Sequence, residues 1–221
     1  MIYMSKLTRI SIIILFFCGS QMNAQKDERA AKILEDFSGQ TLSAPSVTLD
    51  FTIIMSSLRD EVIDEFDGEL TIKGEKYRLK VMGTETWFDG RSIYTYMPEV
   101  NEVMISDSDE EDVGLMSNPA KLFTMYDEEF KYRLVGEINK SGDRLYEIDL
   151  HPVDLDQDFH TVKLFIDRKS NFLHSAVIAG KDGNRYTFIV NSYDKTKTLP
   201  ESYFVFNKSD HPGVEVIDMR W

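Results

Sequence analysis

Residues 47–55 read VTLDFTIIM, and this stretch decides the fold because apolar and polar side chains alternate along it. A period of two is that of a β-strand with one buried face. A slip of one residue would turn every apolar side chain to solvent, so the pattern also specifies the register. We therefore predict a single strand in which five alternate side chains point to the concave side of a sheet: Val47, Leu49, Phe51, Ile53 and Met55.

Short runs with the same period follow along most of the chain. The turns between them contain Gly, Asp, Asn and Pro, as at Asp89-Gly90, a dipeptide typical of tight hairpins. Short strands at regular spacing indicate a meandering antiparallel sheet of about eleven strands. Besides the first strand, we expect a short strand that leads through Trp87 into Asp89-Gly90. The other strands are expected near residues 66–72, 77–81, 93–97, 100–105, 130–135, 144–150, 160–166, 172–178 and 186–190.

Two segments depart from this period and predict helices. The second of them, residues 118–126, begins with Asn118, which can cap a helix, and Pro119, which suits the first helical position. The first, residues 27–37, should end near Gly39 and carries apolar side chains at helical spacing, namely Ala30, Ala31, Ile33, Leu34 and Phe37. The predicted fold class is therefore mainly β with helices.

Composition and charge limit the function. The chain has 221 residues, of which 42% are hydrophobic and 29% charged, and its formal net charge is −13. These proportions are typical of a globular domain rather than a disordered chain. A net negative charge without any run of Lys and Arg argues against nucleic acid as a partner. No repeat or linker divides the chain, so we predict one domain over residues 25–221.

The N-terminus has the pattern of an export signal. Basic residues precede the apolar run at residues 10–17, and the small residues Gly19, Ser20 and Ala24 follow it. The run is too short to span a bilayer, which takes roughly 20 residues. We predict that residues 1–24 are a cleaved signal peptide, that Gln25 is the mature N-terminus, and that the protein is periplasmic.

Cys18 leaves one alternative open, in which it is the lipidated cysteine of a membrane-anchored lipoprotein. That processing requires small residues just before the cysteine, and Phe16 and Phe17 stand there instead. Mass spectrometry of the mature N-terminus separates the two processing routes.

No arrangement of residues indicates catalysis. Cys18 is the only cysteine and lies in the predicted signal peptide, which leaves no thiolate nucleophile or zinc ligand. The acidic stretch that starts at Asp107 has Asp112 and Asn118 where a calcium loop of the EF-hand type requires glycine and glutamate. We predict no enzyme activity, catalytic residue, metal site or cofactor. The histidines are scattered, without the spacing of a helical metal site: His151, His160, His174 and His211.

The apolar face of the predicted sheet allows two interpretations. A long antiparallel sheet tends to curl or close, because open edges pair with other chains. Its inner apolar side chains then either fill an ordinary core or line a cavity for an apolar ligand beneath the helices. The residue pattern alone leaves both open.

Three neighbouring motifs, and their order, are distinctive. They are FDGELTIK at Phe66–Lys73, Tyr77-Arg78-Leu79, and FDGRSIYTY at Phe88–Tyr96. Together with the Asn118-Pro119 helix start, Leu150-His151-Pro152 and Phe204-x-Phe206, they resemble the outer-membrane lipoprotein carrier family, LolA. The likeness covers essentially all of the chain after the predicted signal peptide.

The resemblance implies a half-open antiparallel β-barrel whose apolar concave face is covered by the N-terminal helix and the inserted helix. It also implies a periplasmic chaperone that binds the acyl chains of lipoproteins and carries them from the inner to the outer membrane. The implied partners are lipoproteins, an inner-membrane lipoprotein-releasing complex and an outer-membrane acceptor, with the carrier itself a monomer. The cavity would be lined by Ile33, Leu34, Phe37, Phe51, Ile53, Leu70, Ile72, Leu79, Ile93, Leu122, Phe123 and Tyr126.

One position departs from the family pattern. Well-studied members of the family that this chain resembles carry an arginine directly after the lysine that ends the strand, and that arginine is thought to fasten the lid. Here Gly74 follows Lys73, so the resemblance assigns the latch to no residue. Three other functions stay open. One is a related lipid-binding or membrane-anchored receptor protein of the same fold, and another is a periplasmic hydrolase, for which no nucleophile and base are apparent. The third is a structural subunit of a sheet-edge assembly, which would show a filled barrel without a cavity.

Overall fold

A computed structural model describes residues 27–57, 59, 61–107, 115, 119–123, 129–140 and 142–220. The predictions for the signal peptide, Cys18, Gln25 and Tyr126 fall outside these residues. The strands are β1 Val47–Ser56, β2 Val62–Lys73, β3 Lys76–Val81, β4 Thr84–Phe88, β5 Ser92–Met97, β6 Glu102–Asp107, β7 Phe130–Lys140, β8 Asp143–Pro152, β9 Phe159–Asp167, β10 Leu173–Gly180, β11 Arg185–Asp194 and β12 Glu215–Asp218.

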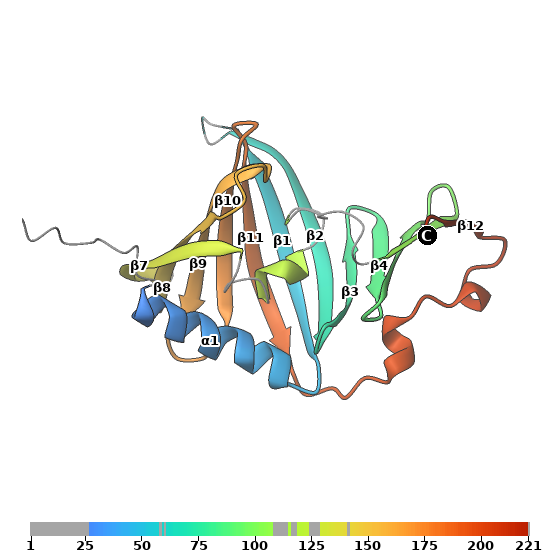
Figure 1. Ribbon diagram of the computed structural model, residues 1–221, viewed down its shortest axis with the longest axis horizontal. Coiled ribbons are helices and arrows are strands. Elements are labelled where there is room, and N and C mark those ends of the chain that lie inside the picture. Colours follow the sequence, from blue (N-terminus) through green and yellow to red (C-terminus); the bar gives the residue numbers. More distant parts are fainter. Residues whose placement is uncertain are drawn as a thin grey trace, which may run out of the picture.

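All twelve strands belong to one sheet, in the order β12-β6-β5-β4-β3-β2-β1-β11-β10-β9-β8-β7. Every neighbouring pair is antiparallel except β12 and β6, which run parallel. The first and last strands of this order do not pair with each other, so the sheet is open. Figure 1 shows it curving from β7 at one end to β12 at the other, with helix α1 lying across one face. We call this face the inner face and the opposite one the outer face.

Helix α1 spans Glu28–Ser43 and is longer than the sequence pattern predicts. The prediction that it ends near Gly39 is wrong, because a single exposed glycine costs only about 1 kcal/mol inside a helix. The helix ends instead at Ser43, and the next residue, Ala44, has the extended backbone that a following proline imposes. At the other end, the Asp27 carboxylate accepts hydrogen bonds from the backbone of Arg29 and Ala30. No helix in the described part of the chain is long and apolar enough to cross a membrane.

The predicted inserted helix is not an α-helix in the residues that the structure describes. Pro119–Phe123 forms a short 3₁₀ helix, η1, instead. An isolated α-helix shorter than about 12 residues is marginal in water, so the conformation of so short a segment depends on its packing. Here Ala120, Leu122 and Phe123 are all buried, so packing rather than helical propensity sets this conformation.

Strand β1 confirms the predicted register. The side chains of Val47, Leu49, Phe51 and Ile53 are at most 3% exposed, and Met55 is half-buried. Thr48, between the first two, faces the outer side, where its hydroxyl lies 3.1 Å from that of Thr71.

The C-terminal residues form a feature that the sequence pattern did not predict. Residues 195–220, here called the C-terminal strap, leave β11 and run past β3 to add β12 beside β6 (Figure 1). Within the strap lie two short 3₁₀ helices, η2 at Glu201–Phe204 and η3 at Lys208–Asp210. Phe204 is fully buried, and the Phe206 ring packs against Trp87 of β4 at a centroid distance of 5.5 Å. The strap therefore gives the β3–β6 end of the sheet a second layer on its outer face.

Candidate ligand-binding site

The inner face of the sheet, α1 and η1 enclose one continuous apolar cluster. Leu34 and Phe37 come from α1, and Leu122 and Phe123 from η1. They pack with strand residues that include Leu49, Phe51, Ile53, Leu70 and Leu79, each at most 3% exposed. Every member of the cluster is aliphatic or aromatic, so the enclosed surface suits an apolar ligand and no charged group.

Aromatic contacts close this interior. The rings of Phe37 and Phe123 lie 5.5 Å apart at an interplanar angle of 43°. Behind them, Phe51 of β1 stacks on Phe188 of β11 at 4.6 Å. The Phe51 ring lies directly over Gly68, where an added Cβ would stand 2.3 Å from its Cζ atom. The FDG motif that carries the resemblance thus includes a glycine that an interior ring requires.

Burial on the inner face falls toward the β6 end. One row of paired residues runs from Tyr77 through Phe88 to Ile93 on β3, β4 and β5. A second row runs from Leu79 on β3 to Met104 on β6. Tyr77 and Leu79 are buried, whereas Phe88, Ile93 and Met104 are half-buried. The inner apolar surface therefore has a closed part beneath α1 and η1 and a part at β4–β6 that solvent reaches.

Most of the twelve residues predicted to line a cavity come together in the structure. Nine lie in the apolar cluster: Leu34, Phe37, Phe51, Ile53, Leu70, Ile72, Leu79, Leu122 and Phe123. Ile33 packs against the cluster and is half-buried. Ile93 lies on the more open part, and Tyr126 falls outside the described residues. Their role in binding remains a prediction. Phe88 and Met104, which face the same side, were missed, although the period of two along β4–β6 could have found them.

The ionisable groups at this site are few. Burial raises the pKa of the Tyr77 phenol to about 12, so this side chain is neutral in the apolar cluster at physiological pH. At the edge of the site, the Asp27 carboxylate accepts a 2.9 Å hydrogen bond from the backbone of Leu134 on β7. That bond is the main reason that the pKa of Asp27 is lowered. It ties the start of α1 to the edge of the sheet.

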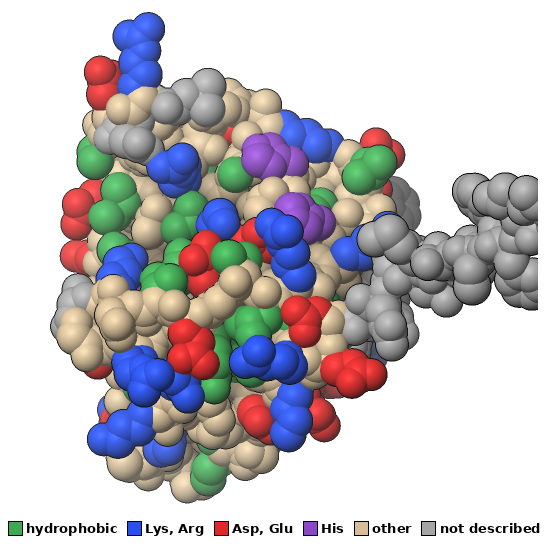
Figure 2. Space-filling model, turned by 90° about the vertical axis from the view of Figure 1, so that its left-hand side faces the viewer, with side chains coloured by type: hydrophobic (Ala, Val, Ile, Leu, Met, Phe, Trp, Pro, Cys, Tyr) green, Lys and Arg blue, Asp and Glu red, His purple; other side chains and the backbone are tan. Residues whose placement is uncertain are grey.

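Where the strap does not cover it, the outer face carries polar and charged side chains among half-buried apolar ones. On β8 and β9, Lys163 lies 2.8 Å from Asp149 and 3.1 Å from Glu147. Figure 2 views the molecule from its β7–β8 end and shows acidic, basic and hydrophobic side chains interspersed there. His151 and His160 both approach the Thr161 hydroxyl, at 3.4 and 3.0 Å. Among the described residues, no three His, Cys, Asp or Glu side chains are grouped to hold a metal ion.

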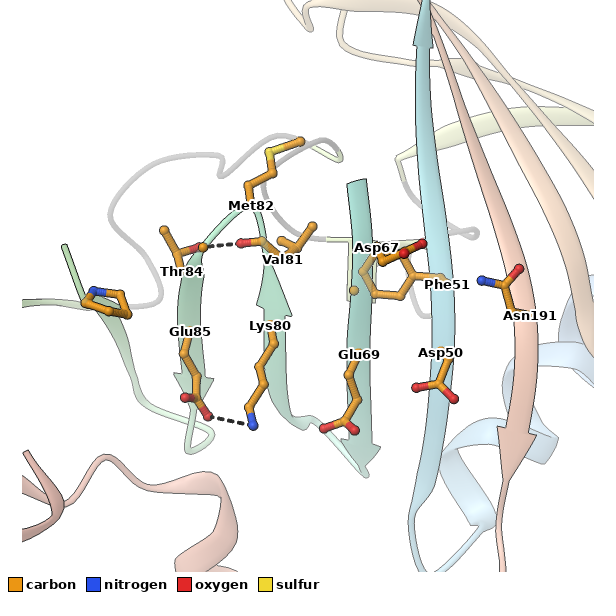
Figure 3. A pocket seen from close by; sticks show the side chains of 13 residues that line it. Asp50, Phe51, Asp67, Glu69, Lys80, Val81, Met82, Thr84, Glu85 and Asn191 are labelled. Atoms are coloured by element: carbon orange, nitrogen blue, oxygen red, sulfur yellow. Dashed lines mark hydrogen bonds and ion pairs between the residues drawn. The ribbon is translucent and has the colours of Figure 1, made fainter. Parts of the chain in front are cut away.

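A hollow of about 650 Å³ lies over β1–β4. Figure 3 views it with the strands in the reverse order to Figure 1, that is, from the outer face. Asp50, Glu69, Lys80 and Glu85 pair in register across it, one from each strand. The lining is rich in charge, and Lys80 and Glu85 lie 3.7 Å apart. An acyl chain gains nothing from such a surface, so the apolar inner face is the better candidate site.

Lys73 does not fasten α1. Its ammonium group donates to the backbone carbonyl of Leu199 at 2.8 Å and pairs with Glu201 at 2.7 Å, both in the strap. Lys76 pairs with the other oxygen of the same carboxylate. Gly74 between them has a φ of 57°, a left-handed backbone that favours glycine over arginine. The turn where the resemblance expects a lid latch therefore clamps the strap instead.

The structure combines a curved antiparallel sheet with an apolar inner face that lies beneath a helix. A sequence profile described as "Outer membrane lipoprotein carrier protein LolA" matches residues 43–207, and the chain belongs to this family. Members of this family are periplasmic and are typically non-enzymatic carriers or binders. No curated protein matches the sequence.

Solved structures are similar to this one at low sequence identity. An uncharacterised conserved protein from Thermus thermophilus has a TM-score of 0.60 and 14% identity, over 86% of this chain and 99% of that one. A LolA superfamily protein from Nitrosomonas europaea has a TM-score of 0.46 and 14% identity, over 80% and 97%. A putative outer membrane lipoprotein-sorting protein domain from Vibrio parahaemolyticus has a TM-score of 0.48 and 11% identity, over 85% and 99%. The first of these shows the fold.

Proposed function

We propose that this protein is a periplasmic carrier that shields the acyl chains of lipoproteins between the inner and outer membranes. The observation that carries the proposal is the continuous apolar cluster between the inner face of the sheet and the pair α1 and η1 in a member of the LolA family. Exposing an acyl chain to water costs about 0.8 kcal/mol per CH₂. A carrier has to offset that cost with apolar surface of its own.

In the structure, the chain's own side chains occupy this surface. Leu34, Phe37 and Phe123 cover the strands and are at most 2% exposed. Cargo must therefore replace their contacts, which requires α1 and η1 to move away from the sheet. The net free energy of cargo binding is then small, because each contact that an acyl chain makes replaces a contact of the lid. A small binding free energy suits a carrier, because the cargo can be released again. The donor would be an inner-membrane lipoprotein-releasing complex, and the acceptor an outer-membrane protein.

The half-buried side chains at β4–β6 are the natural first contact. Phe88, Ile93 and Met104 face the same side as the closed cluster, and solvent reaches them without any movement of α1. Acyl chains would enter there and extend under the lid as it opens.

The test is native mass spectrometry of the protein purified from its own periplasm. We expect a one-to-one complex with a lipoprotein, and a mature N-terminus at Gln25. A matched pair of variants on α1 locates the site: Leu34 is 2% exposed and Leu42 is 39% exposed. Leu34→Asp places a charge in the apolar cluster and should abolish cargo capture, whereas Leu42→Asp should retain it. Circular dichroism serves as the folding control. Purified protein without any lipoprotein, or equal capture by both variants, would contradict the proposal.

A further inference from the structure

Strand β12 is an addition at the edge of the sheet. It contains four residues, all of them exposed, and it forms the one parallel pair in a sheet of antiparallel pairs. The family match ends at residue 207, so β12 lies beyond the matched region. Parallel pairing is slightly less stable per residue than antiparallel pairing. A short, exposed, parallel strand is therefore weakly held compared with the other strands.

The strand that β12 covers is longer and more apolar. Strand β6 has six residues, with Val103 and Ile105 buried on the outer face and Met104 half-buried on the inner face. Backbone bonds to β12 use the outward side of β6: Glu215 donates to the carbonyl of Asn101 at 3.0 Å, and Met219 donates to that of Ile105 at 2.8 Å. Without β12, these backbone groups would form a free edge.

We propose that β6 is a strand-docking edge that β12 masks, and that its partner when β12 is released is β6 of a second copy of this chain. The charges of β6 allow this pairing. Two copies of β6 can pair antiparallel about a two-fold axis at Met104. Val103 of one copy then lies opposite Ile105 of the other, and both residues point their backbone N–H and C=O groups toward the other copy. It sets Glu102 opposite Ser106, so no two carboxylates stand directly opposite.

The inner face favours the same partner. In this pairing the Met104 side chains of the two copies meet, and each half-buried methionine loses solvent-exposed surface. Strand β12 itself offers little for another strand to pair with. Of its four residues, only Val216 and Asp218 point their backbone amides away from β6. Very short edge strands are a recognised protection against edge-to-edge association. The inference concerns association and is independent of the cargo.

Two proline variants of β12 distinguish the loss of its hydrogen bonds to β6 from the effect of a proline at an equally exposed position. Val216 and Ile217 are each 38% exposed, but they alternate along the strand. Because Glu215 and Met219 donate to β6, the amide of Ile217 also faces β6 and that of Val216 faces solvent. Ile217→Pro removes a ladder bond and should release β12. Val216→Pro keeps the ladder and is the matched control.

The measurement is sedimentation velocity over a hundredfold range of protein concentration, with far-UV circular dichroism to verify folding. We expect the mass of Ile217→Pro to rise toward a dimer with concentration, while Val216→Pro behaves as the parent. Hydrogen exchange at Val103 and Ile105 should be faster in dilute Ile217→Pro than in the parent. A chain shortened to residue 214 removes β12 by a second route and should associate in the same way.

The combination of Ile217→Pro with Met104→Lys provides the specificity test. An inward-facing lysine on an edge strand opposes pairing, so this double variant should return to the parent's mass. Unchanged mass in both Ile217→Pro and the shortened chain would overturn the proposal. So would unchanged exchange at Val103 and Ile105, or association that persists with Met104→Lys.

Discussion

The rings of Phe37 on α1 and Phe123 on η1 meet 5.5 Å apart, and both side chains are fully buried. The two covering elements are thus joined to each other as well as to the sheet. If the inner face opens for cargo as proposed, loss of this contact should favour the open form.

Replacement of Phe37 by alanine tests this contact. We expect the free energy of unfolding to fall by about 3–5 kcal/mol, as for other buried phenylalanines. Hydrogen exchange should increase more in α1 than in β1, because opening of the lid leaves the strand ladder intact. Leu42→Ala on the same helix, at a position 39% exposed, is the control and should change little. Equal increases of exchange in α1 and β1 would show that the lid does not open separately.

Asp27 should stabilise the docking of α1 in a pH-dependent way. Its carboxylate caps α1 and accepts the Leu134 amide of β7, so Asp27→Ala should cost at least about 1 kcal/mol at pH 7. The pKa of Asp27 is lowered from its ordinary value of 3.8, first by the Leu134 hydrogen bond. The stabilisation is therefore present above pH 3.8 and is lost as the pH falls through the lower folded pKa. Urea unfolding of the parent and Asp27→Ala at several pH values should converge below pH 3.8. A constant difference would be contrary to this role.

Gly68 should be intolerant of any side chain. A Cβ there would lie 2.3 Å from the Cζ atom of Phe51 and 2.8 Å from the carbonyl oxygen of Lys80. We expect Gly68→Ala to destabilise the protein by about 1–3 kcal/mol through overpacking. Gly136 on β7 has no atom within 4 Å of its added Cβ, so Gly136→Ala is the control. Chemical denaturation measures both variants, and similar stabilities would refute the close packing of Phe51 over Gly68.

The clamp on the C-terminal strap should weaken in acid. Lys73 and Lys76 lower the pKa of Glu201 from 4.5 to about 2. Glu201 contributes stability above pH 4.5, and this contribution disappears as the pH falls to about 2. The Glu201 side chain is 62% exposed, so Glu201→Gln should lower the melting temperature only slightly at pH 7. High salt should remove that difference. A difference that persists in high salt would mean that Glu201 acts by another contact.

The strand pattern made much of the sheet predictable. Alternation at residues 47–55 specified both the strand and its buried face, because a one-residue slip would have exposed Leu49 and Phe51. The Asp89-Gly90 motif likewise placed its hairpin between β4 and β5 correctly. Local side-chain periodicity is sufficient where one face of a strand is buried.

Long-range pairings were the part that local patterns could not supply. Strand β12 is exposed on both sides, so it has no alternation to detect, and it exists because β6 offers an edge. In the same way, the conformation of η1 depends on packing around Phe123 rather than on its five residues. Lys73 reaches Leu199 across 126 positions of sequence, which no spacing rule anticipates.

Site-specific photocrosslinking on α1 tests the central claim most directly. Ile33 packs against the apolar cluster, and its neighbour Lys32 has a side chain that is 70% exposed. A photoreactive amino acid is placed at one or the other position, and the protein is mixed with radiolabelled lipoprotein released from inner-membrane vesicles. The account predicts crosslinks to the acyl chains from position 33 and few from position 32. Equal crosslinking from both positions, or none from position 33 while lipoprotein is still captured, would contradict an acyl site between α1 and the sheet.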